Sequence, residues 1–74
     1  MYNTTKIIER IRFTAKRSGL LIGDVMENAG LSKSTLTNFR TSMPKADNLA
    51  KIADALDCSV DYLLGRTDKS EVNH

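Results

Sequence analysis

The chain of 74 residues has few of the residue types that form disulfides, metal sites and catalytic centres in small proteins. It contains one cysteine, one histidine, one proline and no tryptophan. A single cysteine cannot form an internal disulfide, and the sequence offers no cysteine and histidine cluster to hold a metal ion. The one histidine is the terminal His74, which excludes a histidine-dependent catalytic arrangement inside the fold. We therefore expect no cofactor and no enzymatic activity, and a framework held together by apolar packing.

Long apolar runs are also missing. No stretch approaches the roughly 20 apolar residues of a membrane span, and the first ten residues lack the apolar core of a signal peptide. A chain this short forms one domain, in which a substrate cleft would compete with the core for the same residues. We expect a cytoplasmic domain without membrane contact and without a small-molecule substrate.

Acidic residues are absent between positions 33 and 45, although the net charge of the chain is only +2. Basic residues gather in that stretch and between positions 6 and 17. The acids lie elsewhere, mainly at Asp24, Glu27, Asp47, Asp54, Asp57 and Asp61. This segregation predicts a cationic face that the net charge conceals.

Helical periodicity is the main signal that is present. Apolar residues recur at helical spacing in five segments, at about 5–18, 21–29, 32–40, 46–56 and 60–64. Glycines follow three of these segments, as helix-ending glycines do, and Ser32 and Ser59 are residues that cap helix starts by accepting a backbone N–H. The sequence predicts an all-α domain over residues 1–68 and a flexible C-terminal tail over 69–74.

The second and third segments are joined by very little chain. One ends at Ala29-Gly30 and the next opens at Ser32, with only Leu31 between them. Two short helices joined this tightly cross steeply, which is the geometry of a helix-turn-helix that presents its second helix to the DNA major groove. The inward positions of that second helix are Leu36 and Phe39, which leaves four polar residues facing outward: Lys33, Ser34, Thr37 and Asn38.

These features resemble a known family, the small helix-turn-helix regulators typified by phage repressors and Cro proteins, also called the xenobiotic-response-element group. The matching stretches are Gly19-Leu20, Ala29-Gly30-Leu31-Ser32-Lys33-Ser34-Thr35-Leu36, Pro44, residues 49–56 and Ser59-Val60-Asp61-Tyr62-Leu63-Leu64-Gly65. The resemblance implies a five-helix, lambda-repressor-like domain in which helices 2 and 3 form the helix-turn-helix. It also implies a sequence-specific transcriptional regulator of the repressor type, bacterial or phage-encoded and associated with the nucleoid, that binds a double-stranded DNA operator as a homodimer.

The resemblance assigns roles to individual residues of this sequence. The base-contacting positions are Lys33, Ser34, Thr37 and Asn38. The phosphate contacts that the resemblance implies are Thr41, Ser42 and Lys45. Four further phosphate contacts are expected from the positions of the residues: Ser32, Arg40, and Lys16 and Arg17 near the end of the first helix. A dimer surface is expected at Cys58, Val60 and Tyr62, since Tyr62 would otherwise be an exposed aromatic. Cys58 itself is predicted to be a half-buried structural thiol.

Four positions depart from the family pattern. The helix before the recognition helix opens with Leu21 and Ile22, where the family carries a polar cap and a glutamine that holds a phosphate. Met26 replaces a small alanine, and Arg40 replaces a glutamate. The apolar residues Leu21 and Ile22 at the start of this helix favour a second hypothesis. The chain would then be a protein-interaction module on the same scaffold, such as an antirepressor, an antitoxin-like component or a recruiting subunit.

Overall fold

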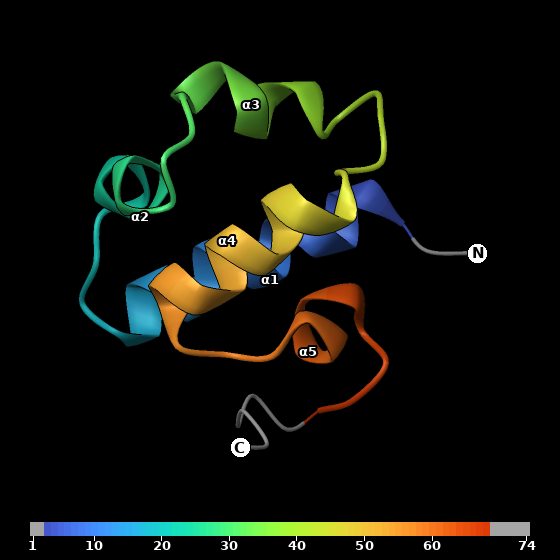
Figure 1. The fold of residues 1–74 in the computed structure, drawn as a ribbon. Coiled ribbons are helices and arrows are strands. Elements are labelled where there is room, and N and C mark those ends of the chain that lie inside the picture. Colours follow the sequence, from blue (N-terminus) through green and yellow to red (C-terminus); the bar gives the residue numbers. More distant parts are fainter. Residues whose placement is uncertain (1–2, 69–74) are drawn as a thin grey trace.

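The computed structural model describes residues 3–68 and contains five α-helices in that range (Figure 1). Their bounds are α1 Thr4–Arg17, α2 Ile22–Asn28, α3 Lys33–Asn38, α4 Ala46–Leu56 and α5 Val60–Leu64. The predicted all-α, five-helix domain is confirmed, and the helix ends differ from the predicted ones by two residues at most. The predicted tail, 69–74, lies outside the described residues.

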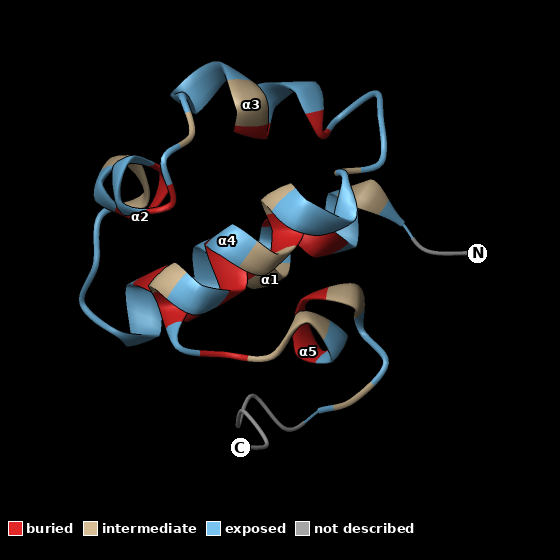
Figure 2. Ribbon diagram, viewed as in Figure 1, coloured by how far each residue is buried: buried red, intermediate tan, exposed pale blue. Residues whose placement is uncertain are grey.

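The helices pack around α4, which lies against α1, α2 and α5. In Figure 1, α3 and α5 lie on opposite sides of the α1–α4 pair. Figure 2 shows the buried residues on the inward side of each helix and exposed residues on the outward side. The largest fully buried side chains are Ile7, Ile11, Val25, Met26, Ile52 and Leu63. Met26, at a position where the family has alanine, is thus absorbed by the core, as a flexible side chain can be.

Four of the five helices end in the same backbone closure. In α2, Leu31 N donates to Met26 O at 2.8 Å and Gly30 N donates to Glu27 O at 2.9 Å, and the equivalent pairs close α1, α4 and α5. This closure needs one residue in the left-handed conformation, where only glycine is free of steric cost. A glycine occupies it after α1, α2 and α5, whereas α4 places Asp57 there with φ 54°.

Of the two helix caps predicted from the sequence, one is confirmed and the other is wrong. Ser59 caps α5 by accepting from Tyr62 N at 3.0 Å. Ser32 occupies the cap position of α3, but its side chain makes no hydrogen bond to the backbone there. The predicted capping bond is wrong because the hydroxyl lies within hydrogen-bonding distance of two other hydroxyls, Ser34 Oγ at 2.7 Å and Thr35 Oγ1 at 3.2 Å.

Tyr62 is a further correction. The expectation that this aromatic is exposed in the single chain is wrong, because its side chain is covered by Arg10 from α1 and is only 7% exposed. Cys58 is also buried, at 3% exposure, rather than half-buried. Of the three residues predicted for a dimer surface, only Val60 keeps intermediate exposure.

Candidate nucleic-acid interface

The turn between α2 and α3 is short and defined by hydrogen bonds. Its closure at Gly30 and Leu31 directs the chain away from the axis of α2, and α3 begins two residues after Leu31. Gly30 has φ 75°, a conformation that L side chains rarely adopt. This turn sets the crossing of the two helices and therefore the face that α3 presents to solvent.

Two side chains fix α3 to the body of the domain. Leu36 is 6% exposed and Phe39, directly after the helix, is 3% exposed, and both belong to the core. The residues predicted to face outward are all exposed: Lys33, Ser34, Thr37 and Asn38. Figure 2 shows this exposed surface along the outer side of α3. The helix thus presents polar side chains on the face that packing does not use.

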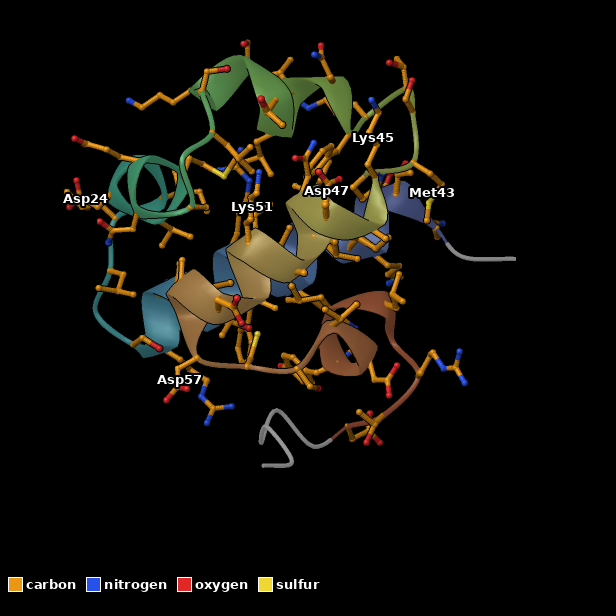
Figure 3. All side chains as sticks on the ribbon, in the orientation of Figure 1. Asp24, Met43, Lys45, Asp47, Lys51 and Asp57 are labelled. Carbon is orange, nitrogen blue, oxygen red and sulfur yellow. The ribbon has the colours of Figure 1, made fainter. Side chains whose placement is uncertain are left out.

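The loop after α3 turns tightly around one carbonyl. Asn38 O accepts from Thr41 N at 3.2 Å, from Ser42 N at 3.1 Å and from Thr41 Oγ1 at 3.3 Å. The four residues predicted to contact phosphates from this loop are exposed: Arg40, Thr41, Ser42 and Lys45. Figure 3 shows Lys45 at the start of α4, on the side of α4 that faces α3. The polar groups of the loop therefore adjoin those of α3.

The positive charges of this region are not neutralised by the protein. Among residues 3–68 the ion pairs are Lys6–Glu9 at 3.7 Å and Arg66–Asp61 at 3.6 Å, and neither involves α3 or the loop after it. Lys33, Arg40 and Lys45 therefore have no ion-pair partner among these residues. One exposed acid, Asp47, lies beside Lys45 in the first turn of α4 (Figure 3).

Arg17 is not brought to this region. Its guanidinium lies 5.9 Å from the ring centroid of Phe13 on the same helix. It also lines a hollow of about 140 Å³ with residues of the α4 end, among them Asp57 and Cys58. The structure therefore groups Arg17 with the C-terminal end of α4 rather than with α3. Lys16 is exposed one residue before it.

Cys58 has the properties of a structural thiol. Burial, and after it the negative charge of Asp57, raise the pKa of Cys58 to about 11. Such a thiol is almost entirely protonated at neutral pH and is a poor nucleophile and a poor metal ligand. In the part of the chain that the structure describes, no group of three histidine, cysteine or acidic residues is arranged to hold a metal ion. Nor is any helix there long and apolar enough to cross a membrane.

Comparisons with known proteins agree with this geometry. Residues 10–69 match the Cro/C1-type helix-turn-helix DNA-binding domain. The chain belongs to this family. Its fold is also similar to the solution structure of the DNA-binding domain of the P22 C2 repressor, with 32% sequence identity and a TM-score of 0.73. That similarity covers 96% of this chain and 95% of the other. None of the curated proteins matches the sequence significantly.

This Cro/C1-type domain is therefore a DNA-binding regulator of the repressor type, and its α2 is unusual at its start. Leu21 stands at the N-cap, makes no side-chain hydrogen bond and is 73% exposed. Ile22 packs partly against the core. Neither side chain has a donor, so the start of α2 offers no side-chain contact to a phosphate.

Sequence reasoning did not single out Gly23 on α2, which lies beside the end of the Lys33 side chain. A methyl group on Gly23 would lie 2.8 Å from Lys33 Cε and 3.3 Å from Lys33 Nζ. The only sequence signal was a glycine inside a short helix, where alanine would be more favourable. The contact partner, ten residues away on another helix, was not visible in the pattern.

Proposed function

We propose that this domain binds a specific operator by inserting α3 into the major groove, and that two copies bind a two-fold site. The observation that carries this proposal is the division of α3 into two faces. Leu36 and Phe39 are used for packing, and the polar side chains on the other face are exposed without ion pairs in residues 3–68. A helix of this kind presents donors and acceptors to base edges.

Ser34, Thr37 and Asn38 are the proposed base readers. The carboxamide of Asn38 suits adenine, to which it pairs through both its donor and its acceptor, and the Thr37 methyl suits a thymine methyl. Each good bidentate contact contributes about 1–3 kcal/mol of discrimination. Arg40, Thr41, Ser42 and Lys45 are proposed to hold phosphates and so to set the register, with Ser32 at the other end of the helix.

The dimer is proposed because one domain offers few contacts. Half-sites bound by two copies lie about one helical turn, ~34 Å, apart. We propose the contact between copies at α5, where Val60 and Leu64 keep intermediate exposure, whereas Cys58 and Tyr62 are buried within the single chain. Acting on DNA, the protein is proposed to work in the cytoplasm of a bacterium, as a regulator and not as an enzyme.

Selection from a random duplex library, followed by binding titrations on the selected sequence, tests this function. We expect a defined site with two-fold symmetry. If the dimer covers about 6–10 phosphates, its affinity falls roughly 10³–10⁵-fold between 50 and 200 mM salt. Asn38→Ala is expected to relax the preference at one base pair in each half-site, while stability stays within about 0.5 kcal/mol because the side chain is exposed. An Asn38→Ala variant with unchanged sequence preference would remove the base-reading assignment.

The protein-interaction alternative is favoured by one observation, the two neighbouring apolar side chains of Leu20 and Leu21, which are both exposed. The same titrations separate the two functions. Absence of any shifted duplex at 50 mM salt, combined with a stable complex between this chain and a second protein, would replace the DNA-binding proposal with the alternative. Leu21→Asn should then weaken that complex.

A further inference from the structure

Lys33 does not extend along the outer face of α3 with its polar neighbours. Its last methylene lies over Gly23 of α2, so closely that a methyl group on Gly23 would approach Lys33 Cε to 2.8 Å and Nζ to 3.3 Å. The side chain thus runs from the start of α3 back across to the first turn of α2. Its ammonium group lies on the α2 side of the recognition helix, away from Thr37 and Asn38 further along.

Gly23 makes this course of the side chain possible. Its φ is not in the left-handed region, so the backbone at this position does not require a glycine. In a helix, glycine is less favourable than alanine. The space left by the missing methyl group is the space that the end of Lys33 occupies, which gives the glycine a role in the interface.

The direction of Lys33 determines what it meets on DNA. When a helix-turn-helix docks, its second helix lies in the major groove while its first helix crosses the sugar–phosphate backbone. An ammonium group that lies beside the first helix therefore meets a phosphate rather than a base edge. Leu21 and Ile22 supply no donor at that place, whereas the ammonium group of Lys33 can make the contact.

We propose that Lys33 contacts a phosphate rather than a base, and that Gly23 is a positioning residue that leaves room for the Lys33 side chain against α2. This inference rests on the proposed function, since it assigns one contact within that interface. It divides the outward residues of α3 into a phosphate contact at Lys33 and base readers at Ser34, Thr37 and Asn38.

The test uses the whole chain and the duplex selected by it, with Lys33→Ala, Gly23→Ala and the double variant. Lys33→Ala should lower affinity by the same factor on the selected duplex and on its single-base variants. The slope of log K against log salt should become smaller by about 0.9 per bound chain. Gly23→Ala should reproduce part of this loss, add nothing in the Lys33→Ala background, and leave the melting temperature unchanged or raised.

Two comparisons sharpen the result. Arg66→Ala removes one positive charge from a residue beyond α5 and should leave the salt slope as in the wild type. A duplex in which one phosphate is replaced by an uncharged methylphosphonate should abolish the difference between wild type and Lys33→Ala at a single position. In the free protein, a nuclear Overhauser effect should connect the Lys33 ε-protons with the Gly23 α-protons.

The outcomes that overturn the inference differ from those that overturn the function. If Lys33→Ala changes preference at one base pair, Lys33 reads a base. If Gly23→Ala binds like wild type, Gly23 does not position Lys33. The same conclusion follows if the loss of affinity in Gly23→Ala adds fully to the loss in Lys33→Ala. In these cases DNA binding stands and this inference fails, whereas a wild-type chain that binds no duplex removes both.

Discussion

Arg10 and Tyr62, 52 residues apart in the sequence, are joined by two contacts. The guanidinium of Arg10 lies 5.1 Å from the centroid of the Tyr62 ring, and its Nη1 donates to the Tyr62 carbonyl oxygen at 3.2 Å. The first contact covers the aromatic ring and the second binds the backbone of α5. Arg10 therefore fastens the last helix of the domain to the first.

Replacing Arg10 by alanine is expected to destabilise the domain. The cation–π contact contributes about 0.5–1 kcal/mol and the hydrogen bond about 0.5–1.5 kcal/mol. Their loss should lower the free energy of unfolding by about 1–2 kcal/mol and the melting temperature by roughly 5–15 °C. Thermal unfolding followed by circular dichroism measures this change.

Arg12→Ala is the matched control, because Arg12 is exposed on the same helix and no described contact ties it to α5. It should shift the melting temperature by no more than about 3 °C. Equal shifts for the two variants would mean that the contacts of Arg10 with Tyr62 add nothing to stability.

Asp57→Gly should stabilise the domain. Asp57 has φ 54° and ψ 45° at the end of α4, in the conformation that glycine adopts after α1, α2 and α5. Removing the side chain relieves the left-handed strain, and part of that gain is offset by the larger entropy of the unfolded chain. We expect a gain of about 0.5–1 kcal/mol in urea unfolding.

The same substitution at Asp54, an exposed position inside α4, supplies the contrast. There the backbone is helical and glycine costs about 0.5–1 kcal/mol, so Asp54→Gly should lower the midpoint that Asp57→Gly raises. Shifts of the same sign would show that the conformation of Asp57 is not strained.

The free energy of unfolding should decrease as the pH rises above 9, because the thiol of Cys58 ionises more readily in the unfolded chain than in the folded one. Burial and Asp57 raise the pKa of this thiol from 9.0 to about 11. The folded chain then holds its proton more tightly than the unfolded chain. The resulting stability is complete below pH 9, declines as the unfolded thiol ionises above pH 9, and is lost by about pH 11.

The urea midpoints of wild type and Cys58→Ala should be compared from pH 7 to 11.5. The difference between them isolates the effect of the Cys58 thiol on stability from the effects of tyrosine and lysine, which titrate in both proteins. The difference between the two proteins should be constant up to pH 9 and change between pH 9 and 11. A difference that stays constant over the whole range would mean that the thiol of the folded chain titrates normally.

Arg40→Ala should weaken operator binding without affecting the fold. Arg40 is exposed directly after α3 and has no ion pair in the described residues. As a phosphate contact it should reduce the slope of log K against log salt by about 0.9 per bound chain, and Arg40→Glu should weaken binding further by repulsion. An unchanged slope in Arg40→Ala, measured beside Arg66→Ala, would exclude a phosphate contact at this position.

Local signals made the helices predictable. Their positions followed from apolar spacing, and three of the four closures from a glycine at the required position. The fourth closure, at Asp57, carried no such signal because aspartate adopts the left-handed conformation only occasionally. Ser32 was a cap by residue type, yet its hydroxyl found side-chain partners that compete with the backbone.

The sequence predicted those features of the candidate site that depend on the spacing of residues within one helix. It did not predict those that depend on contacts between two helices. The outward face of α3 follows from the two buried positions on the same helix. The burial of Tyr62 depends on Arg10 from α1, and the course of Lys33 depends on Gly23 from α2. Such contacts join positions whose relative placement is set by the packing of helices, so spacing along the chain does not reveal them.

The two-residue attachment of α3 has a consequence for how this regulator changes its target. Because Leu36 and Phe39 hold the helix, Ser34, Thr37 and Asn38 are free to vary without loss of stability. Lys33 is tied to Gly23, so it stays with the scaffold. New operators are therefore accessible through changes at three codons or fewer on an unaltered domain, and a library randomised at these positions should consist largely of folded proteins.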